Sequence, residues 1–454
     1  MSKMTSLERT FIELAREWLG EEMLTGGSRR CLFTTALTAW LMIAQKLIPR
    51  GTLSKVVHLL KGGMLREDTC RMMVGRRIDV LSVGSGTGGL SRARSRLKME
   101  VVEELSDLIY EEATRETSGT GRWKGRAIYI QDGTTIPVQN TAELRRRYEP
   151  CQNERGERTP AVRVVVVHNL VSGLAVRPEF DSLRVSEQEL ARRMYERLEP
   201  ASILLGDENF GVFSSVYWAL RGGHDVVARL QGKRAQKILG RAVPPSCDER
   251  VIWTPSHRDR GTNPNIPEDA MIAGRLLSVQ LHAPGYRPTP FLFFTTDMDL
   301  SIEDVLELYR MRVRVETDIR HLKGNFRLDV LMTKSVAMVA KELLLGVAAY
   351  NLLRVCIHRG AQAIGVEPRR VSLSRASDLL HSLAALYLRD PTKEMQKKIQ
   401  ALFLRDLKQS LLPNRKKARV EPRKLVRSSA RRFQTLLTSR SEERTAILKE
   451  GLGK

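Results

Sequence analysis

The stretch AIYIQDGT at positions 127–134 joins a short apolar run to an aspartate and a Gly-Thr turn. It predicts a buried strand that ends at Asp132. The valine-rich stretch AVRVVVVHNL at 161–170 predicts a central strand, and Ser-Gly at 172–173 predicts a turn. Residues 174–180 are then expected to pair back as a hairpin. These strands decide the fold class, because a sheet built around them needs helices to cover its faces.

Working outward, further short strands are expected at 202–206, 225–230 and 291–296, with helices at 187–198 and 212–220. Three strands followed by alternating helices and strands predict an α/β core with a mixed sheet, which we place at 126–230 and 291–360. Residues 231–290 hold many Pro and Gly and short β-like pieces, so we expect a β-rich inserted subdomain. Ser301 is expected to cap a long helix, and a second apolar helix is expected at 341–356.

The two ends of the chain differ from this core. Residues 1–125 are expected to form a helical N-terminal region, because 11–19, 31–47, 53–60 and 98–112 show apolar spacing near 3.6. The helix that follows the glycines of 84–89 opens with Arg92, Arg94 and Arg96, which either contact DNA phosphates or face solvent. The last region, 361–454, has 22 Lys and Arg against 9 Asp and Glu. Its stretch 415–432 is expected to be an extended basic segment that either contacts DNA or is a solvated tail.

Composition narrows the class of protein. The 454 residues carry a net charge of +23, so nucleic acid is the first partner to consider. A hydrophobic share of 42% excludes disorder of the whole chain. Five widely spaced cysteines without a C-x-x-C pair suit a reducing cytoplasm and argue against structural zinc. The apolar run 31–44 is too short to span a bilayer, so we expect no membrane association.

Three carboxylates stand out by position. Asp132 and Asp207 each end a predicted strand, and Glu316 lies in a predicted helix. Acidic groups at strand ends gather at one edge of an α/β sheet, where ligand sites tend to lie. Carboxylates without His or Cys partners suit Mg²⁺ or Mn²⁺. Each aspartate taken alone is weak evidence of a functional site, because a turn residue or a helix cap has the same pattern.

The helix around Glu316 carries a charged face. Tyr309, Arg312, Arg320 and Lys323 lie at offsets −7, −4, +4 and +7, within about 40° of Glu316 at helical spacing. Arginine holds phosphate with two hydrogen bonds, lysine acts as a point charge, and tyrosine can donate to or stack on DNA. A solvent face laced with salt bridges would have the same pattern.

Tyr309-x2-Arg312-x3-Glu316-x6-Lys323 matches the YREK signature of the insertion sequence 4 family of bacterial DDE transposases, and the chain resembles that family over about 90–360. Three other segments resemble family motifs in the same order: 131–134, 206–211 and 349–354. The resemblance implies a ribonuclease-H-like core in which Asp132, Asp207 and Glu316 hold two Mg²⁺ ions, with Mn²⁺ as a substitute.

The resemblance also implies a reaction and partners. The protein is expected to bind the terminal inverted repeats of its own element as a homodimer, in the bacterial cytoplasm, and to cut and join double-stranded DNA through a hairpin intermediate. Arg312, Arg320 and Lys323 would position phosphates, and Tyr309 would contact DNA beside the scissile bond. Phe291 or Trp253 would stack on a flipped base, or either ring is core packing. Glu208 is expected to point away from Asp207.

Other functions compete with this interpretation. A structure-specific nuclease on the same core would need the same carboxylates but would not join DNA ends. A DNA-binding protein derived from a transposase would have no need of all three carboxylates. A glycosidase with paired carboxylates would leave the charge of +23 and the cations around Glu316 unexplained.

Overall fold

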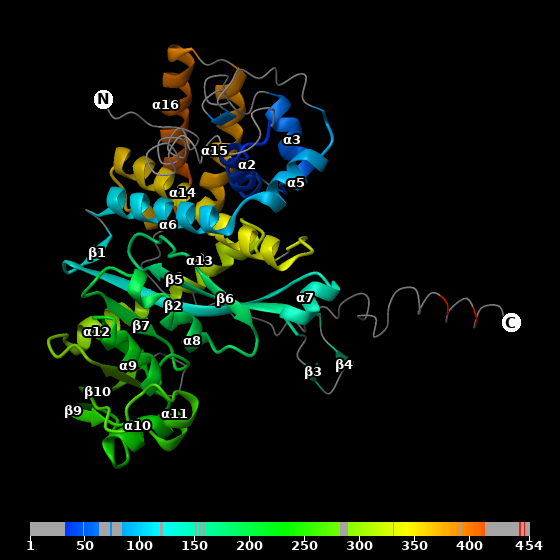
Figure 1. Ribbon diagram of the computed structural model, residues 1–454. Coiled ribbons are helices and arrows are strands. Elements are labelled where there is room, and N and C mark those ends of the chain that lie inside the picture. The colour runs from blue at the N-terminus through cyan, green and yellow to red at the C-terminus, as the bar shows by residue number, and fades with distance from the viewer. Residues whose placement is uncertain are drawn as a thin grey trace.

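The computed structural model describes residues 32–413 except 49, 63–72, 75–83, 119–120, 150–151, 154–155, 158, 282–288, 330 and 390–391, and describes positions 445 and 449 beyond them. The helix expected at 11–19 and the basic segment expected at 415–432 lie outside the described residues. The fold is mixed α/β, with one large sheet between two groups of helices (Figure 1).

The sheet has the order β6-β5-β2-β7-β8-β11-β10-β9, and the short strand β1 also pairs with the start of β2. Among the strand pairs formed by described residues, β2–β7 and β7–β8 are parallel and the others are antiparallel. The predicted mixed sheet is therefore present. Its strands are β1 (Arg122–Trp123), β2 (Arg126–Pro137), β5 (Ala161–Asn169), β6 (Glu179–Ser182), β7 (Ile203–Gly206), β8 (Asp225–Arg229), β9 (Cys247–Trp253), β10 (Ile272–Leu281) and β11 (Thr289–Thr295). A separate hairpin joins β3 (Gln152–Asn153) and β4 (Gly156–Glu157).

Residues 231–290 contribute strands β9 and β10 to the large sheet. We expected these residues to form an inserted β-rich subdomain. In the structure these residues contain β9 and β10; β10 pairs with β9 and, along seven positions, with β11, and β11 pairs with β8, so both strands continue the core sheet. Backbone hydrogen bonds across the sheet depend on pairing between distant segments, which composition does not reveal.

Helices cover both faces of the sheet. One face packs against α8 (Glu187–Arg192), α9 (Phe213–Arg221) and α10 (Gly232–Leu239). The other face packs against α12 (Ile302–Met311), α13 (Val313–Gly324) and α14 (Val336–Ala363). Around α14 lie the remaining long helices, gathered above the sheet in Figure 1: α2 (Thr35–Leu47), α3 (Leu53–Lys61), α5 (Gly88–Arg96), α6 (Met99–Thr117), α15 (Leu373–Arg389) and α16 (Lys393–Gln409). Short helices are α7 (Ala142–Arg147), α11 (His257–Thr262), η2 (Tyr195–Arg197) and η3 (Pro368–Arg370).

Two expected elements differ in detail. Strand β6 begins only at Glu179, because residues 174–176 return beside β5 through hydrogen bonds such as Val176 N–H to the Val167 carbonyl. The helix capped by Ser301 is interrupted at Arg312, where the Arg312 and Val315 N–H groups bond to carbonyls three residues back. This tighter winding separates α12 from α13.

Helix α14 is long and apolar enough to span a bilayer by length and composition, yet 89% of its most apolar stretch is buried within the protein. It packs between the N-terminal helices and the sheet, as the core helix of a folded domain does.

Candidate active site

Strand register brings Asp132 and Asp207 together. Ile130 of β2 is paired with Leu205 of β7 in parallel, so the two aspartates lie two residues beyond a matched pair. Side chains alternate along strands, and Ile128, Ile130 and Leu205 pack on the face covered by α12 and α13. Asp132 and Asp207 therefore project from the same face toward α13.

Both aspartates accept backbone hydrogen bonds, and Asp207 also has the turn role that the sequence left open. An Asp132 Oδ1 accepts a hydrogen bond from the Gly133 N–H at 2.8 Å. Asp207 Oδ1 accepts from the Asn209 N–H at 2.9 Å and the Phe210 N–H at 3.3 Å. Asp207 thus directly follows β7, which ends at Gly206. Asp132 lies within β2, which continues to Pro137, so the expected end of this strand at Asp132 was wrong: residues 133–137 continue to pair with β5.

Burial dominates the electrostatic environment of Asp132. Burial raises the pKa of Asp132 to about 6, and the negative charges of Asp207 and Glu187 act in the same direction. The Gly133 N–H and the Arg312 guanidinium oppose this rise. A carboxyl held in such a place is stabilised by any cation that enters it.

Helix α13 brings Glu316 to the same region. Arg312 Nη2 lies 3.5 Å from Asp207 Oδ2, and Arg312 Nη1 lies 3.6 Å from Glu316 Oε1. Arg312 thus stands between the two carboxylates. The Glu316 side chain is 54% exposed, so it faces outward from the sheet edge.

The donor set fits a hard divalent cation in its chemistry. Asp132, Asp207 and Glu316 offer only oxygen, and the pKa of Asp132 is raised mainly by burial and further by its acidic neighbours Asp207 and Glu187. Among the residues that the structure describes, however, no three His, Cys, Asp or Glu side chains lie close enough to share one ion. The spacing reflects Arg312, which occupies the space between Asp207 and Glu316.

Beside the carboxylates lies a cluster that the sequence did not reveal in full. Arg229 of β8 lies over the Phe291 ring at 4.8 Å, donates to the Tyr309 hydroxyl at 3.2 Å and pairs with Glu208 at 2.9 Å. Phe291 and Tyr309 contact edge to face. Glu208 forms its ion pair with Arg229, whereas the neighbouring Asp207 forms one with Arg312. No local pattern marks Arg229, since its partners come from three distant segments.

Glu187 is a second residue that the sequence analysis missed. Its carboxylate lies against Gly133 and accepts a hydrogen bond from Asn209 Nδ2 at 2.6 Å. Glu187 begins α8, where an acidic residue is ordinary because it favours the helix dipole. The sequence therefore carries no separate signal for its position.

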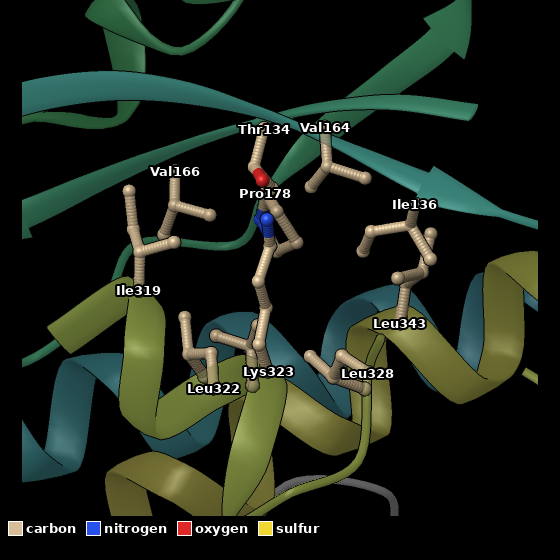
Figure 2. Close-up of a pocket in the computed structure, with 11 residues that line it drawn as sticks. Thr134, Ile136, Val164, Val166, Pro178, Ile319, Leu322, Lys323, Leu328 and Leu343 are labelled. Carbon is tan, nitrogen blue, oxygen red and sulfur yellow. The ribbon is translucent and has the colours of Figure 1, made fainter. Parts of the chain in front are cut away.

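The two cations at the end of the charged face differ in exposure. Arg320 is exposed and has no ion pair with another residue that the structure describes. Lys323 is partly buried and lines a small cavity between the sheet and α13. In Figure 2 its side chain extends from α13 toward Thr134 and Pro178, past apolar side chains. Thr134 shares the sheet face of Asp132, so Lys323 approaches the strand that carries the first aspartate.

Two predicted DNA contacts lie in the interior instead. Trp253 is 6% exposed and packs edge to face with Phe213 and Phe294, so its ring fills the core rather than receiving a base. Arg94 is buried and pairs with Glu342 at 2.5 Å. Arg94 lies on the inward face of α5, whereas Arg92 and Arg96, two residues away on either side, lie on its exposed face.

Comparisons with known proteins place this site in context. The family model described as "Transposase DDE domain" matches residues 123–352, about half of the chain, and this range includes all three carboxylates. The chain is also similar to "Transposase InsG for insertion sequence element IS4" of Escherichia coli (strain K12). The two are 23% identical over 400 residues, which cover 84% of each chain.

Proposed function

This chain belongs to the family of transposases with a DDE domain, and on that premise we propose that it excises and inserts an insertion sequence by cutting and joining DNA at Asp132, Asp207 and Glu316. The observation that carries the proposal is the convergence of Asp132 and Asp207 on one sheet face with Glu316 beside them across Arg312. The similarity to the transposase of an insertion sequence element supports the same function.

Asp132, Asp207 and Glu316 would hold Mg²⁺, or Mn²⁺ in its place. Two such ions, when bound, would supply activation of the attacking oxygen and stabilisation of the leaving oxygen. Arg312 holds two of these carboxylates now, and its guanidinium would turn to a DNA phosphate when they are otherwise neutralised. Lys323 and exposed Arg320 would contact phosphates on either side of the cut.

The aromatic cluster would hold DNA next to the cut. Phe291 is partly exposed at the rim of the site, whereas Trp253 is buried, so Phe291 is our candidate for stacking on an unpaired base. Tyr309 would orient the strand from the neighbouring helix. A hairpin intermediate, in which a freed 3′ hydroxyl attacks the opposite strand, would use this stacking to hold a displaced base.

We further propose how the rest of the chain serves the reaction. Residues 1–125, with exposed Arg92 and Arg96, and residues 361–454 would bind the terminal repeats and bring two copies of the chain together. Residues 126–230 and 291–360 would form the catalytic core, and 231–290 would extend its sheet toward DNA.

The test is cleavage and joining of a labelled duplex that carries the element end, with Mg²⁺ or Mn²⁺ and a target plasmid. The wild type should cut at the end and join it to the plasmid. Glu316→Gln should bind the same duplex and do neither. Glu307→Gln, which changes an exposed glutamate on α12, is the matched control and should keep both activities.

Each departure from this result has a definite meaning. Cutting without joining would indicate a structure-specific nuclease. Binding without cutting by the wild type would indicate a DNA-binding derivative of a transposase. Equal activity of the wild type and Glu316→Gln would remove Glu316 from the site.

A further inference from the structure

The helix that carries Glu316 is held from behind by a buried charged cluster. Asp318 lies two residues after Glu316 and is therefore about 200° around α13 from it. Its side chain is fully buried. It accepts hydrogen bonds from Arg354 at 2.6 Å, from Arg369 at 2.7 and 2.8 Å, and from the Tyr350 hydroxyl at 3.1 Å.

The same partners hold the turn that follows β5. The Tyr350 hydroxyl also bonds to the Gly173 carbonyl at 2.8 Å, and Arg369 donates to the carbonyls of residues 169–171. Asn351 adds a pair of bonds to the backbone of Ala175 at 2.9 and 2.8 Å. Gly173 has a φ of +81°, and a Cβ there would lie 2.8 Å from Arg369 Cζ, so this close approach requires glycine.

These contacts connect both sides of the active site. Strand β5 pairs with β2, and its Val166 lies directly opposite Asp132. Asp318 is on α13 with Glu316. The cluster therefore connects the strand next to Asp132 to the helix that carries Glu316. The connection runs through Tyr350 and Arg354 of α14 and Arg369 of η3.

We propose that Asp318, Arg354, Arg369 and Tyr350 are positioning residues that set the rotation of α13, and with it the place of Glu316 relative to Asp207. Helix α13 needs such a hold, because it is separated from α12 by the break at Arg312, and Glu316 itself is 54% exposed. A buried ion pair is a poor means of adding stability compared with apolar packing, whereas its directional bonds fix an orientation. The inference rests on the proposed cleavage reaction.

A second buried cluster in this protein is a matched control. Glu342, also on α14, is nearly buried between Lys46 at 3.0 Å and Arg94 at 2.5 Å. Like Asp318, it is one carboxylate between two cations, but its hydrogen bonds join α14 to α2 and α5. Breaking either cluster disturbs a buried carboxylate that is paired with two cations, while only the Asp318 cluster holds the helix that carries Glu316.

The experiment compares Asp318→Asn, Arg369→Lys and Tyr350→Phe with Glu342→Gln in the full-length protein. Three quantities are measured: the melting temperature, the dissociation constant for the element-end duplex, and the single-turnover cleavage rate with protein in excess. Hydrogen exchange of the α13 backbone amides provides a readout that does not depend on activity. Arg369→Lys and Tyr350→Phe keep the Asp318 charge and most of the packing, so they remain informative if Asp318→Asn does not fold.

Arg369→Lys and Tyr350→Phe should bind the duplex within about twofold of wild type yet cleave it more slowly, since misplacing a reacting group costs up to about 10²-fold. Their α13 amides should exchange faster. Glu342→Gln should keep the wild-type cleavage rate per bound duplex and the wild-type exchange of α13. The inference is overturned if the Asp318-cluster variants cleave bound DNA as the wild type does, or if Glu342→Gln slows cleavage equally. Absence of cleavage by the wild type would instead overturn the proposed function.

Discussion

Replacing His168 with leucine should make the stability of this protein less dependent on pH between 7.5 and 5. His168 lies in β5, is fully buried, and neither ring nitrogen has a hydrogen-bond partner among the described residues. It contacts the Tyr350 ring edge to face. The charged and titratable groups around it are Asp318 and His321 of α13, Arg354 of α14 and Arg369 of η3.

The size of the effect follows from the pKa of His168. Burial lowers this pKa to about 4; Asp318 opposes the decrease and the two arginines add to it. In the unfolded chain a histidine has a pKa of about 6.5. Above that pH both states are neutral, and below it the unfolded state binds a proton that the folded state does not. The free energy of unfolding therefore falls as the pH drops from about 6.5 toward 4, by about 2 kcal/mol between pH 7.5 and 5.

The assay is urea unfolding at pH 7.5 and pH 5, followed by circular dichroism, for the wild type and His168→Leu. The wild type should lose about 2 kcal/mol more than the variant over this interval. His257→Leu, which replaces an exposed histidine of α11, is the control and should follow the wild type. A parallel loss of stability in the wild type and His168→Leu would refute the conclusion that His168 is buried as a neutral group.

Three further predictions concern DNA and packing. Trp253→Ala should lower the free energy of unfolding by about 3–5 kcal/mol, because it leaves a cavity in the core. Phe291→Ala should mainly slow cleavage. If Trp253→Ala kept its stability and lost cleavage, Trp253 and not Phe291 would be the ring that stacks on DNA. Affinity for the element end should fall on the order of 10³-fold between 50 and 200 mM salt, and Arg320→Ala should reduce the log–log slope by about one, as measured by fluorescence anisotropy. An unchanged slope would show that Arg320 contacts no phosphate. Gly274→Ala should cost about 1–3 kcal/mol in urea unfolding, since its Cβ would lie 2.3 Å from Phe294 Cζ and 2.7 Å from a backbone carbonyl; wild-type stability would contradict this.

The sequence by itself determined the local features of this protein. The apolar run before Asp132 is enough to predict a strand that carries this carboxylate, because side-chain alternation depends only on neighbouring residues. It did not predict where the strand ends, since β2 continues to Pro137. The same holds for α13, where helical spacing places Arg312 next to Glu316, and the two are 3.6 Å apart in the structure. The basic character of the chain likewise follows from composition and predicts a polyanionic partner.

Tertiary structure alone decided which distant residues meet. Strands β9 and β10 join the core sheet, Arg229 reaches Tyr309, and Glu187 lies against Gly133, all through pairings between remote segments. Arg94 and Trp253 are residue types that commonly contact DNA, yet both are buried here, because burial depends on which other residues pack against a side chain. Local periodicity sets the face on which a side chain lies, whereas register and packing set its partner, and those are properties of the whole folded chain.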